Sequence, residues 1–403
     1  MRKGKTVIGR LAAVLGSAAL VMAVAGASAQ GKKDVVWSVH VDITGPASYS
    51  GAQQAAGFKD YVAWKNSQGG IRGRKIRLIL TDTTFKPAVA VAGFKKVLAE
   101  SKPVFVSGDG TAMIKAITPE NNSTHHILMT SGSFATQFDN PKSYPYHFMG
   151  GPSYGDMMEI LLIYIKQQHK GAGKPSVAIV HSNLTFGRDP IQRAREVAKR
   201  LGIEVKLVQQ TKFNEAAVGP FSLAIRRVRP DYVIFHGYAF SVWPEIMRQV
   251  QDYGLKSKFM GTVWAMDRAK VAKIGPAADG YMGVQPFPYK TTDVKGSMMN
   301  VITELHKKKN PNYDGYAQLG YMQSWMNAMI ATKAIEMTLD AGKELNAKNM
   351  AMALRSLKNW DTGGLYGKPV SFRGQKIGVG RIYRFNAKKD WTPEPISDWI
   401  EVK

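Results

Sequence analysis

Residues 35–73 read VVWSVHVDITGPASYSGAQQAAGFKDYVAWKNSQGGIRG, and this stretch decides the fold. Its first part, Val35–Ile43, is rich in β-branched residues and predicts a buried strand. Gly45 and Pro46 predict a turn after that strand. Gly51–Ser67 then carries apolar side chains at helical spacing, and the glycine pair behind it predicts the end of a helix. A strand, a polar turn and a helix in this order form the first half of a βαβ unit.

The same alternation of β-branched runs and amphipathic runs continues to residue 130. We expect further strands over Lys75–Asp82, Val104–Ser107 and Ile127–Thr130, and helices over Lys86–Ser101 and from Thr111 onward. Strands that alternate with helices predict a parallel sheet with helices on both faces.

The pattern starts again after Tyr146–Gly151 and predicts a second doubly wound unit. We expect its helices over Ser153–Gln168, Arg188–Leu201, Phe221–Arg229 and Pro244–Tyr253, and its strands over Ser176–His181, Glu204–Gln209, Tyr232–Phe235 and Lys258–Val263. The remainder predicts a mostly helical stretch over Asp293–Leu357, including Gln318–Asp340, and short strands at Val370–Phe372, Gly380–Phe385 and Trp399–Val402. The fold class is therefore α/β with two parallel-sheet lobes.

The first thirty residues predict export. Four cations within residues 1–10 precede an apolar run from Leu11 to Ala25, and Ala27-Ser28-Ala29 forms a small-x-small cleavage pattern. We therefore expect residues 1–29 to be a cleavable signal peptide and the mature protein to be soluble in the periplasm.

Composition narrows the function classes further. The chain has no cysteine, which excludes disulfides, thiolate metal sites and cysteine nucleophiles. Its formal net charge is +25, but the basic residues are scattered in short groups and an exported protein does not meet nucleic acid. We expect no nucleic-acid partner and no cofactor.

Further along the chain, Thr44-Gly45-Pro46, Ser50-Gly51 and Gly69-Gly70-Ile71-x-Gly73 resemble a known family in combination. The same is true of Asp82 with Pro87 and Ala90, of Phe259-Met260-Gly261 and of Gly280-Tyr281. The sequence is similar to the periplasmic leucine/isoleucine/valine-binding family, the type I solute-binding proteins of ABC transporters, over essentially the whole mature chain.

That resemblance implies two lobes joined by a three-strand hinge. The first lobe would comprise residues 30–149 and 286–366, and the second residues 150–285 and 367–403. The hinge crossings would fall near Met149–Gly151, Val284–Pro286 and Leu365–Pro369. The partners it implies are a small-molecule ligand and the permease subunits of an ABC importer, and we expect the receptor to be a monomer.

The resemblance also implies a ligand site between the lobes. Relatives hold a ligand carboxylate with N–H groups and hydroxyls of the first lobe and line the pocket with aromatic side chains of the second. The matching residues, together with the first loop, give the predicted ligand-binding set: Tyr49, Ser50, Thr111, Ala112, Gly132, Ser133, Phe134, Phe186, Tyr238 and Trp264. Thr111 and Ala112 are expected to begin a helix, whose N-terminus attracts an anion.

One departure from the family pattern bears on the ligand. Amino-acid-binding relatives carry an acidic residue after the strand Lys258–Val263 to pair with the ligand ammonium, whereas this chain has Val263 or Trp264 there. A buried, unpaired ammonium costs about 2–5 kcal/mol. We therefore expect an aromatic or hydrophobic carboxylate. Asp267, a few residues further on, is the candidate to replace the missing acidic residue, so a branched-chain or other amino acid stays an alternative ligand. A ligand-sensing receptor module is a further alternative.

An enzyme is the other class considered. Gly108-Asp109-Gly110 follows a strand, but Met113 occupies the position where a third glycine would complete a dinucleotide-binding motif. His125 and His126 are adjacent and lack metal-ligand spacing, and His236 is expected to be a satisfied histidine near the cleft. We expect no catalytic activity.

Overall fold

The computed structural model describes residues 32–213, 215–291 and 296–402, and the described chain from Lys33 onward forms one compact unit. The predicted signal peptide, residues 1–29, lies outside the described residues. Within the described ranges no helix combines the length and the hydropathy that crossing a membrane requires.

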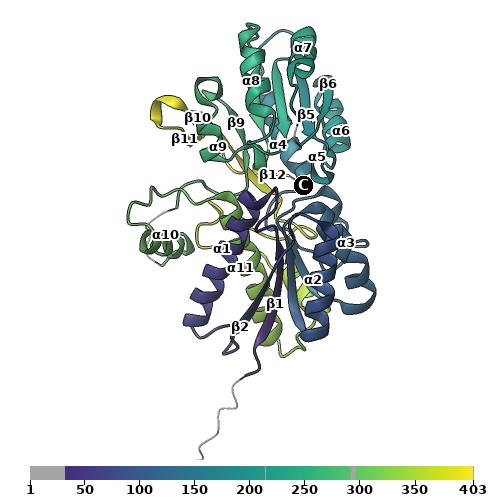
Figure 1. Ribbon diagram of the computed structural model, residues 1–403, viewed down its shortest axis with the longest axis vertical. Helices are drawn as coiled ribbons and strands as arrows, with labels where there is room; N and C mark the ends of the chain where they lie inside the picture. Colours follow the sequence, from purple (N-terminus) through teal and green to yellow (C-terminus); the bar gives the residue numbers. More distant parts are fainter. Residues whose placement is uncertain (1–31, 214, 292–295, 403) are drawn as a thin grey trace, which may run out of the picture. The chain divides into compact units, whose positions relative to one another are not determined.

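The first sheet is built from four parallel strands in the order β2-β1-β3-β4. They are β1 (Val35–Val41), β2 (Ile76–Asp82), β3 (Pro103–Gly108) and β4 (Leu128–Ser131). The helices that join and cover them are α1 (Ser48–Ser67), α2 (Pro87–Glu100) and α3 (Thr111–Glu120), with α10 (Met298–Lys309), α11 (Leu319–Asp340) and α12 (Ala347–Ser356) returning later in the chain. Figure 1 shows α1 and α11 side by side along this sheet.

The second sheet is larger and mixed. Its order is β11-β10-β9-β8-β7-β5-β6, with β12 paired to β10. The parallel strands are β5 (Ser176–Ser182), β6 (Glu204–Thr211), β7 (Tyr232–His236), β8 (Lys258–Gly261) and β9 (Met282–Gln285). The antiparallel edge consists of β10 (Val379–Asn386), β11 (Thr392–Pro395) and β12 (Ile400–Glu401).

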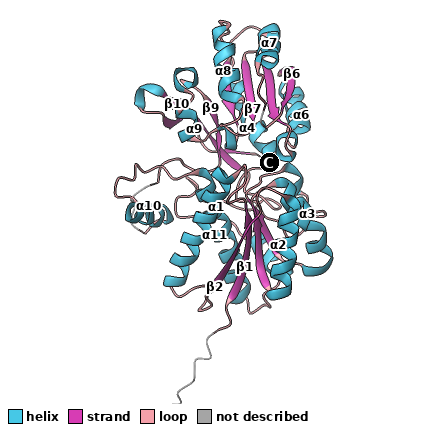
Figure 2. Cartoon of the chain, viewed as in Figure 1, coloured by secondary structure: helices cyan, strands magenta, loops and turns pink. Residues whose placement is uncertain are grey.

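Helices cover this second sheet as well, as Figure 2 shows. They are α4 (Tyr154–Gln168), α5 (Thr185–Arg188), α6 (Ile191–Leu201), α7 (Gly219–Val228), α8 (Trp243–Asp252) and α9 (Arg268–Ala272). The predicted α/β class with two doubly wound units is therefore confirmed. The antiparallel edge was not predicted, because short terminal strands do not reveal their pairing direction.

Each sheet has its own aromatic core. In the first, Trp37 of β1 is fully buried between the rings of Tyr61 and Phe105, at centroid distances of 6.2 and 5.2 Å. In the second, Trp243 of α8 stacks on Phe235 of β7 at 4.7 Å. A further buried cluster spans both sheets and includes Val106 of β3 and Val177 of β5.

Two predicted strands differ from the structure. The predicted strand Lys258–Val263 ends at Gly261, because Val263–Ala265 forms a 3₁₀ turn that directs the chain out of the sheet. The predicted strand Val370–Phe372 is wrong: it forms only a single bridge, between Val370 and Trp360. Val370 and Phe372 are buried in the core of the first sheet, so their β-branched and aromatic character reflects packing.

Gly51 of α1 offers a test of how closely the first loop packs. A Cβ at Gly51 would lie 1.9 Å from the carbonyl oxygen of Asp42, whereas a Cβ at Gly219 would have no heavy atom within 4 Å. We expect Gly51→Ala to lower the free energy of unfolding by about 1–3 kcal/mol. Gly219→Ala should leave it unchanged or raise it slightly. Urea denaturation of both variants measures the difference, and equal stabilities would contradict the described packing.

Candidate functional site

A cavity of about 240 Å³ lies where the carboxyl ends of strands from both sheets meet. The first sheet contributes residues that follow β2, β3 and β4, and the second contributes residues that follow β5, β7 and β8. The lining residues are Phe85, Pro87, Asp109, Gly110, Thr111, Ala112, Met113, Gly132, Tyr154, Leu184, Thr185, Phe186, Tyr238 and Trp264. Ligand sites of open α/β sheets lie at this edge, beyond the carboxyl ends of the strands.

The side formed by the first sheet is suited to an anion. Thr111, Ala112 and Met113 form the first turn of α3, where a helix has no acceptors of its own for the N–H groups. The positive end of the helix dipole lies there too. The hydroxyl of Thr111 shares a 2.6 Å hydrogen bond with that of Ser133, which fixes the loop after β4 against the helix.

The side formed by the second sheet is aromatic. The ring centroid of Tyr238 lies 5.0 Å from that of Phe186 and 6.1 Å from that of Trp264. The indole nitrogen of Trp264 donates a 2.9 Å hydrogen bond to the hydroxyl of Tyr154. This bond satisfies the polar atom of a buried tryptophan and fixes the orientation of its ring, so the wall is preorganised.

His236 supports this wall from behind. It is fully buried, and its ring nitrogens lie 2.6 Å from the hydroxyl of Thr262 and 3.0 Å from the carbonyl oxygen of Phe186. Burial lowers the pKa of His236 to about 3, so the imidazole is neutral at pH 7. The prediction of a satisfied histidine is confirmed, and its bond to Phe186 positions one aromatic ring of the cavity.

Asp109 is the carboxylate among the lining residues. It accepts a hydrogen bond from the backbone N–H of Asp42, while its Oδ1 atom is buried without a partner among the described residues. Burial, with the neighbouring Asp42 carboxylate adding to it, raises the pKa of Asp109 to about 7. The lining of the cavity therefore includes one carboxyl group whose pKa is raised by burial.

The structure brings six of the ten predicted site residues together. Those six line the cavity: Thr111, Ala112, Gly132, Phe186, Tyr238 and Trp264. Ser133 lies directly behind them through its bond to Thr111. Phe134 is buried beside Tyr154, with ring centroids 6.1 Å apart, and supports the wall without lining the cavity.

Tyr49 and Ser50 lie elsewhere. Ser50 is buried in α1 and accepts a 3.2 Å hydrogen bond from Gln54. Tyr49 lines a neighbouring cavity of about 200 Å³, where its hydroxyl donates a 2.8 Å hydrogen bond to Asp267. Asp267 also accepts from the N–H of Lys270 and caps α9, so its carboxylate is directed to that second cavity.

Sequence reasoning missed several lining residues. Phe85 has a φ of 58° in the loop after β2, and no pattern in the sequence predicts this left-handed conformation. Tyr154 begins α4, and its place in the amphipathic pattern of that helix gives no sign of a ligand site. Asp109 was noted only within an incomplete nucleotide motif, although its place after a strand was the signal that it faces the site.

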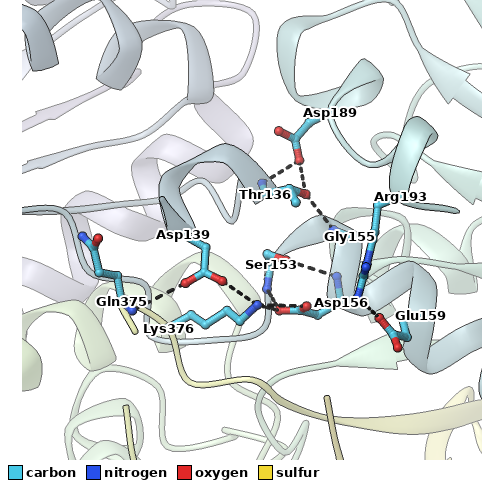
Figure 3. Close-up of polar contacts among 10 residues, drawn as sticks. All are labelled: Thr136, Asp139, Ser153, Gly155, Asp156, Glu159, Asp189, Arg193, Gln375 and Lys376. Carbon is cyan, nitrogen blue, oxygen red and sulfur yellow. Dashed lines mark hydrogen bonds and ion pairs between the residues drawn. The ribbon is translucent and has the colours of Figure 1, made fainter. Parts of the chain in front are cut away.

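Two of the segments that connect the sheets lie side by side next to the site. Met149 and Lys376 form a parallel bridge, with the N–H of Met149 donating to the carbonyl of Gln375 at 2.8 Å. The ammonium of Lys376 lies 2.7 Å from Asp139 and 2.9 Å from Asp156, as Figure 3 shows. Nearby, Asp189 accepts two 2.6 Å hydrogen bonds from the backbone and hydroxyl of Thr136.

The comparisons with known proteins agree with this architecture. Residues 39–390 match the family model described as periplasmic binding protein. The chain belongs to this family. It is thus a solute-binding protein. Within the described residues, no group of three or more His, Cys, Asp or Glu side chains is placed to hold a metal ion.

Individual relatives are distant but cover nearly the whole chain. A Leu/Ile/Val-binding protein of Citrobacter freundii is 21% identical over 336 residues, which cover 82% of this chain and 88% of that protein. A valine-bound branched-chain amino acid ABC transporter protein of Thermus thermophilus has a TM-score of 0.80 at 20% identity, covering 92% and 97% of the two chains. A solute-binding protein of Rhodopseudomonas palustris BisB5, solved with 3,4-dihydroxybenzoic acid, has a TM-score of 0.73 at 17% identity, covering 92% and 98%.

The Lys376 cluster generates a stability prediction. Lys376 is 9% exposed, and removing its charge leaves Asp139 and Asp156 facing each other without a counter-ion. We expect Lys376→Met to lower the free energy of unfolding by about 3–5 kcal/mol. Lys368→Met removes a surface ion pair with Glu401 and should cost about 1 kcal/mol or less. Guanidinium denaturation compares the two variants, and similar losses would contradict a buried ion cluster.

Proposed function

We propose that this periplasmic binding protein closes on a small aromatic or hydrophobic carboxylate and presents it to the permease of an ABC importer. The observation that carries the proposal is the composition of the cavity: a helix N-terminus on one side and an aromatic wall on the other. Its volume of about 240 Å³ is below the roughly 300–1,000 Å³ of sites for drug-sized ligands, so it suits a small molecule.

The lining also favours a ligand without an ammonium group. Trp264 occupies the position after β8, and its indole nitrogen is directed to Tyr154. Asp267 is held by Tyr49 and by its own helix in the neighbouring cavity. Asp109 remains, and with a pKa near 7 it is a weaker counter-ion at neutral pH than an ordinary carboxylate.

A branched-chain amino acid is the second candidate, favoured by Asp109 and by relatives whose names state that they bind leucine, isoleucine and valine. The solute-binding protein of Rhodopseudomonas palustris, in contrast, was solved with a dihydroxybenzoic acid. The same fold therefore accommodates both ligand classes in different proteins. The polar groups that line the cavity determine which class a given protein binds.

Closure would use the three crossings between the sheets as a hinge. We propose lobes of residues 30–149 with 286–366 and of residues 150–285 with 367–403, with one adjustment at the third crossing. Val370 and Phe372 pack in the first core, and the bridge of Lys376 to Met149 follows them. This packing favours a third crossing at about Gln375–Ile377.

The cellular role follows from the same proposal. Residues 1–29 would direct export and be removed, the mature protein would act as a periplasmic monomer, and it would bind its ligand without altering it. A ligand that binds only the native state raises the melting temperature by mass action.

A thermal-shift comparison tests the ligand class. We expect benzoate-like acids to raise the melting temperature by several degrees at about 100-fold excess over Kd, and leucine to do so much less. Trp264→Ala should weaken binding by about tenfold or more, because it removes one aromatic face. Trp391→Ala, a partly buried tryptophan away from the cavity, serves as the control. Micromolar leucine binding with no response to aromatic acids would reverse the assignment.

The pH dependence of binding separates the two ligand classes independently. Asp109 is neutral below its pKa of about 7 and negative above it, so affinity for a carboxylate should fall as pH rises through that value. An ammonium held by Asp109 would produce the opposite slope. Calorimetric titration on both sides of pH 7 measures the sign, and Asp109→Asn should remove the dependence. A pH-independent affinity in the unmodified protein would show that Asp109 does not face the ligand.

A further inference from the structure

The second lobe carries a basic hollow at the edge of its sheet that faces away from the ligand cavity. The hollow has a volume of about 660 Å³ and is lined by residues at the amino ends of β7 and β8. Tyr232 and Lys258 begin these strands and pair in register there. The ligand cavity lies at the carboxyl ends of the same strands, so the two features occupy opposite edges of one sheet.

Cations dominate this hollow and its rim. Four exposed cations line the hollow with one exposed carboxylate, Asp231: they are Lys170, Arg229, Lys256 and Lys258. Lys174, Arg226 and Arg227 are exposed within three residues of a lining residue in the sequence, as is Asp252, and Glu204 is exposed at the start of β6. Direct contacts hold two further cations, Arg226 and Lys206, at the hollow. Arg226 lies 5.0 Å from the ring centroid of Tyr253, which lines the hollow, and Lys206 donates to the carbonyl oxygen of Arg229 at 3.4 Å.

Exposed cations at this edge outnumber exposed carboxylates, so a net positive charge remains although Asp231 lies close enough to Lys206 for their charges to interact. Asp231 accepts hydrogen bonds from the backbone and hydroxyl of Ser176 at 2.8 and 2.7 Å, so its carboxylate is directed to the start of β5. Lys258 lies over the ring of Tyr232 at 5.6 Å, a cation–π contact that holds the charge at the surface.

The rim also offers an apolar contact. Leu223 is 49% exposed and belongs to α7, the helix that carries Arg226 and Arg227. Residues three and four apart lie on one face of a helix, so the leucine and both arginines point the same way. Cations that surround an exposed apolar side chain and tyrosine rings are the chemistry that a membrane surface with anionic headgroups recognises.

We propose that this basic edge of the second lobe is a docking surface for the anionic phospholipid membrane. Headgroup phosphates would contact the cations around the hollow, and Leu223 would reach the boundary of the acyl chains. Docking at this edge leaves the ligand cavity at the opposite edge of the sheet unobstructed. The inference is independent of which ligand the cavity takes.

Co-sedimentation with vesicles tests the docking surface, using the chain from Gln30 onward, which contains all of the described cores. We expect binding to phosphatidylcholine vesicles that contain about a third phosphatidylglycerol, little binding to pure phosphatidylcholine, and weakening as salt is raised. Arg227→Gln/Lys256→Gln/Lys258→Gln should lower the partition coefficient on the order of tenfold or more. Leu223→Ser should lower it by a smaller factor.

The control removes the same charge elsewhere. Lys307, Lys308 and Lys309 are exposed at the end of α10, where Lys309 pairs with Asp60 and Lys307 with Glu304. Their triple replacement by Gln should change the partition coefficient less than about twofold, because an interaction with the basic edge depends on position and not on net charge. An unchanged circular dichroism spectrum and melting temperature show that each variant is folded.

Two outcomes would overturn the inference. One is the absence of binding to anionic vesicles at low salt, which would leave an acidic protein as the partner of this edge. The other is an equal loss in the two triple variants, which would mean that the membrane responds only to total charge.

Discussion

The parallel direction of the strands is the constraint on which the rest of the structure depends. In a parallel sheet all carboxyl ends lie at one edge, and the polar loops that follow them collect there. This chain applies that rule in two sheets, whose strands β2, β3, β4, β5, β7 and β8 all lead into one cavity. The site is thus a product of topology, because segments far apart in the sequence each add between one and five lining residues to it.

The two sides of the cavity differ in the chemistry that they offer. The first sheet supplies a helix N-terminus and the bonded hydroxyls of Thr111 and Ser133. The second supplies aromatic rings, supported by the bond of the Trp264 indole N–H to Tyr154 and by the contact of His236 with the backbone carbonyl of Phe186. A ligand with an anionic end and an apolar body satisfies both sides at once. Within each side the groups already hold their positions before the ligand arrives, which lowers the cost of ordering them on binding.

The sequence predicted the fold well, since its signal is repeated many times along the chain. Alternation of strands and helices recurs in both halves, and most elements begin and end within a few residues of the expected positions. Six of the residues that line the cavity were also in the predicted set, because the resemblance to relatives points to the loops at strand ends. The remaining lining residues were missed for local reasons: Phe85 depends on an unusual backbone angle, and Tyr154 depends on how the start of α4 meets the turn after β8 through Trp264.

The resemblance to relatives did not predict correctly which cavity Tyr49 lines. The position of Tyr49 on the first loop was predictable, but its hydroxyl binds Asp267 and lines a separate cavity. Only the packing between the two sheets decides which of two neighbouring cavities a loop residue faces.

The most direct test of the central claim is a crystal structure of the protein with a bound benzoate-like acid. The account predicts the carboxylate at the N–H groups of Thr111, Ala112 and Met113, and the ring among Phe186, Tyr238 and Trp264. A ligand found in the cavity beside Tyr49 and Asp267, or a carboxylate turned toward the aromatic wall, would contradict it.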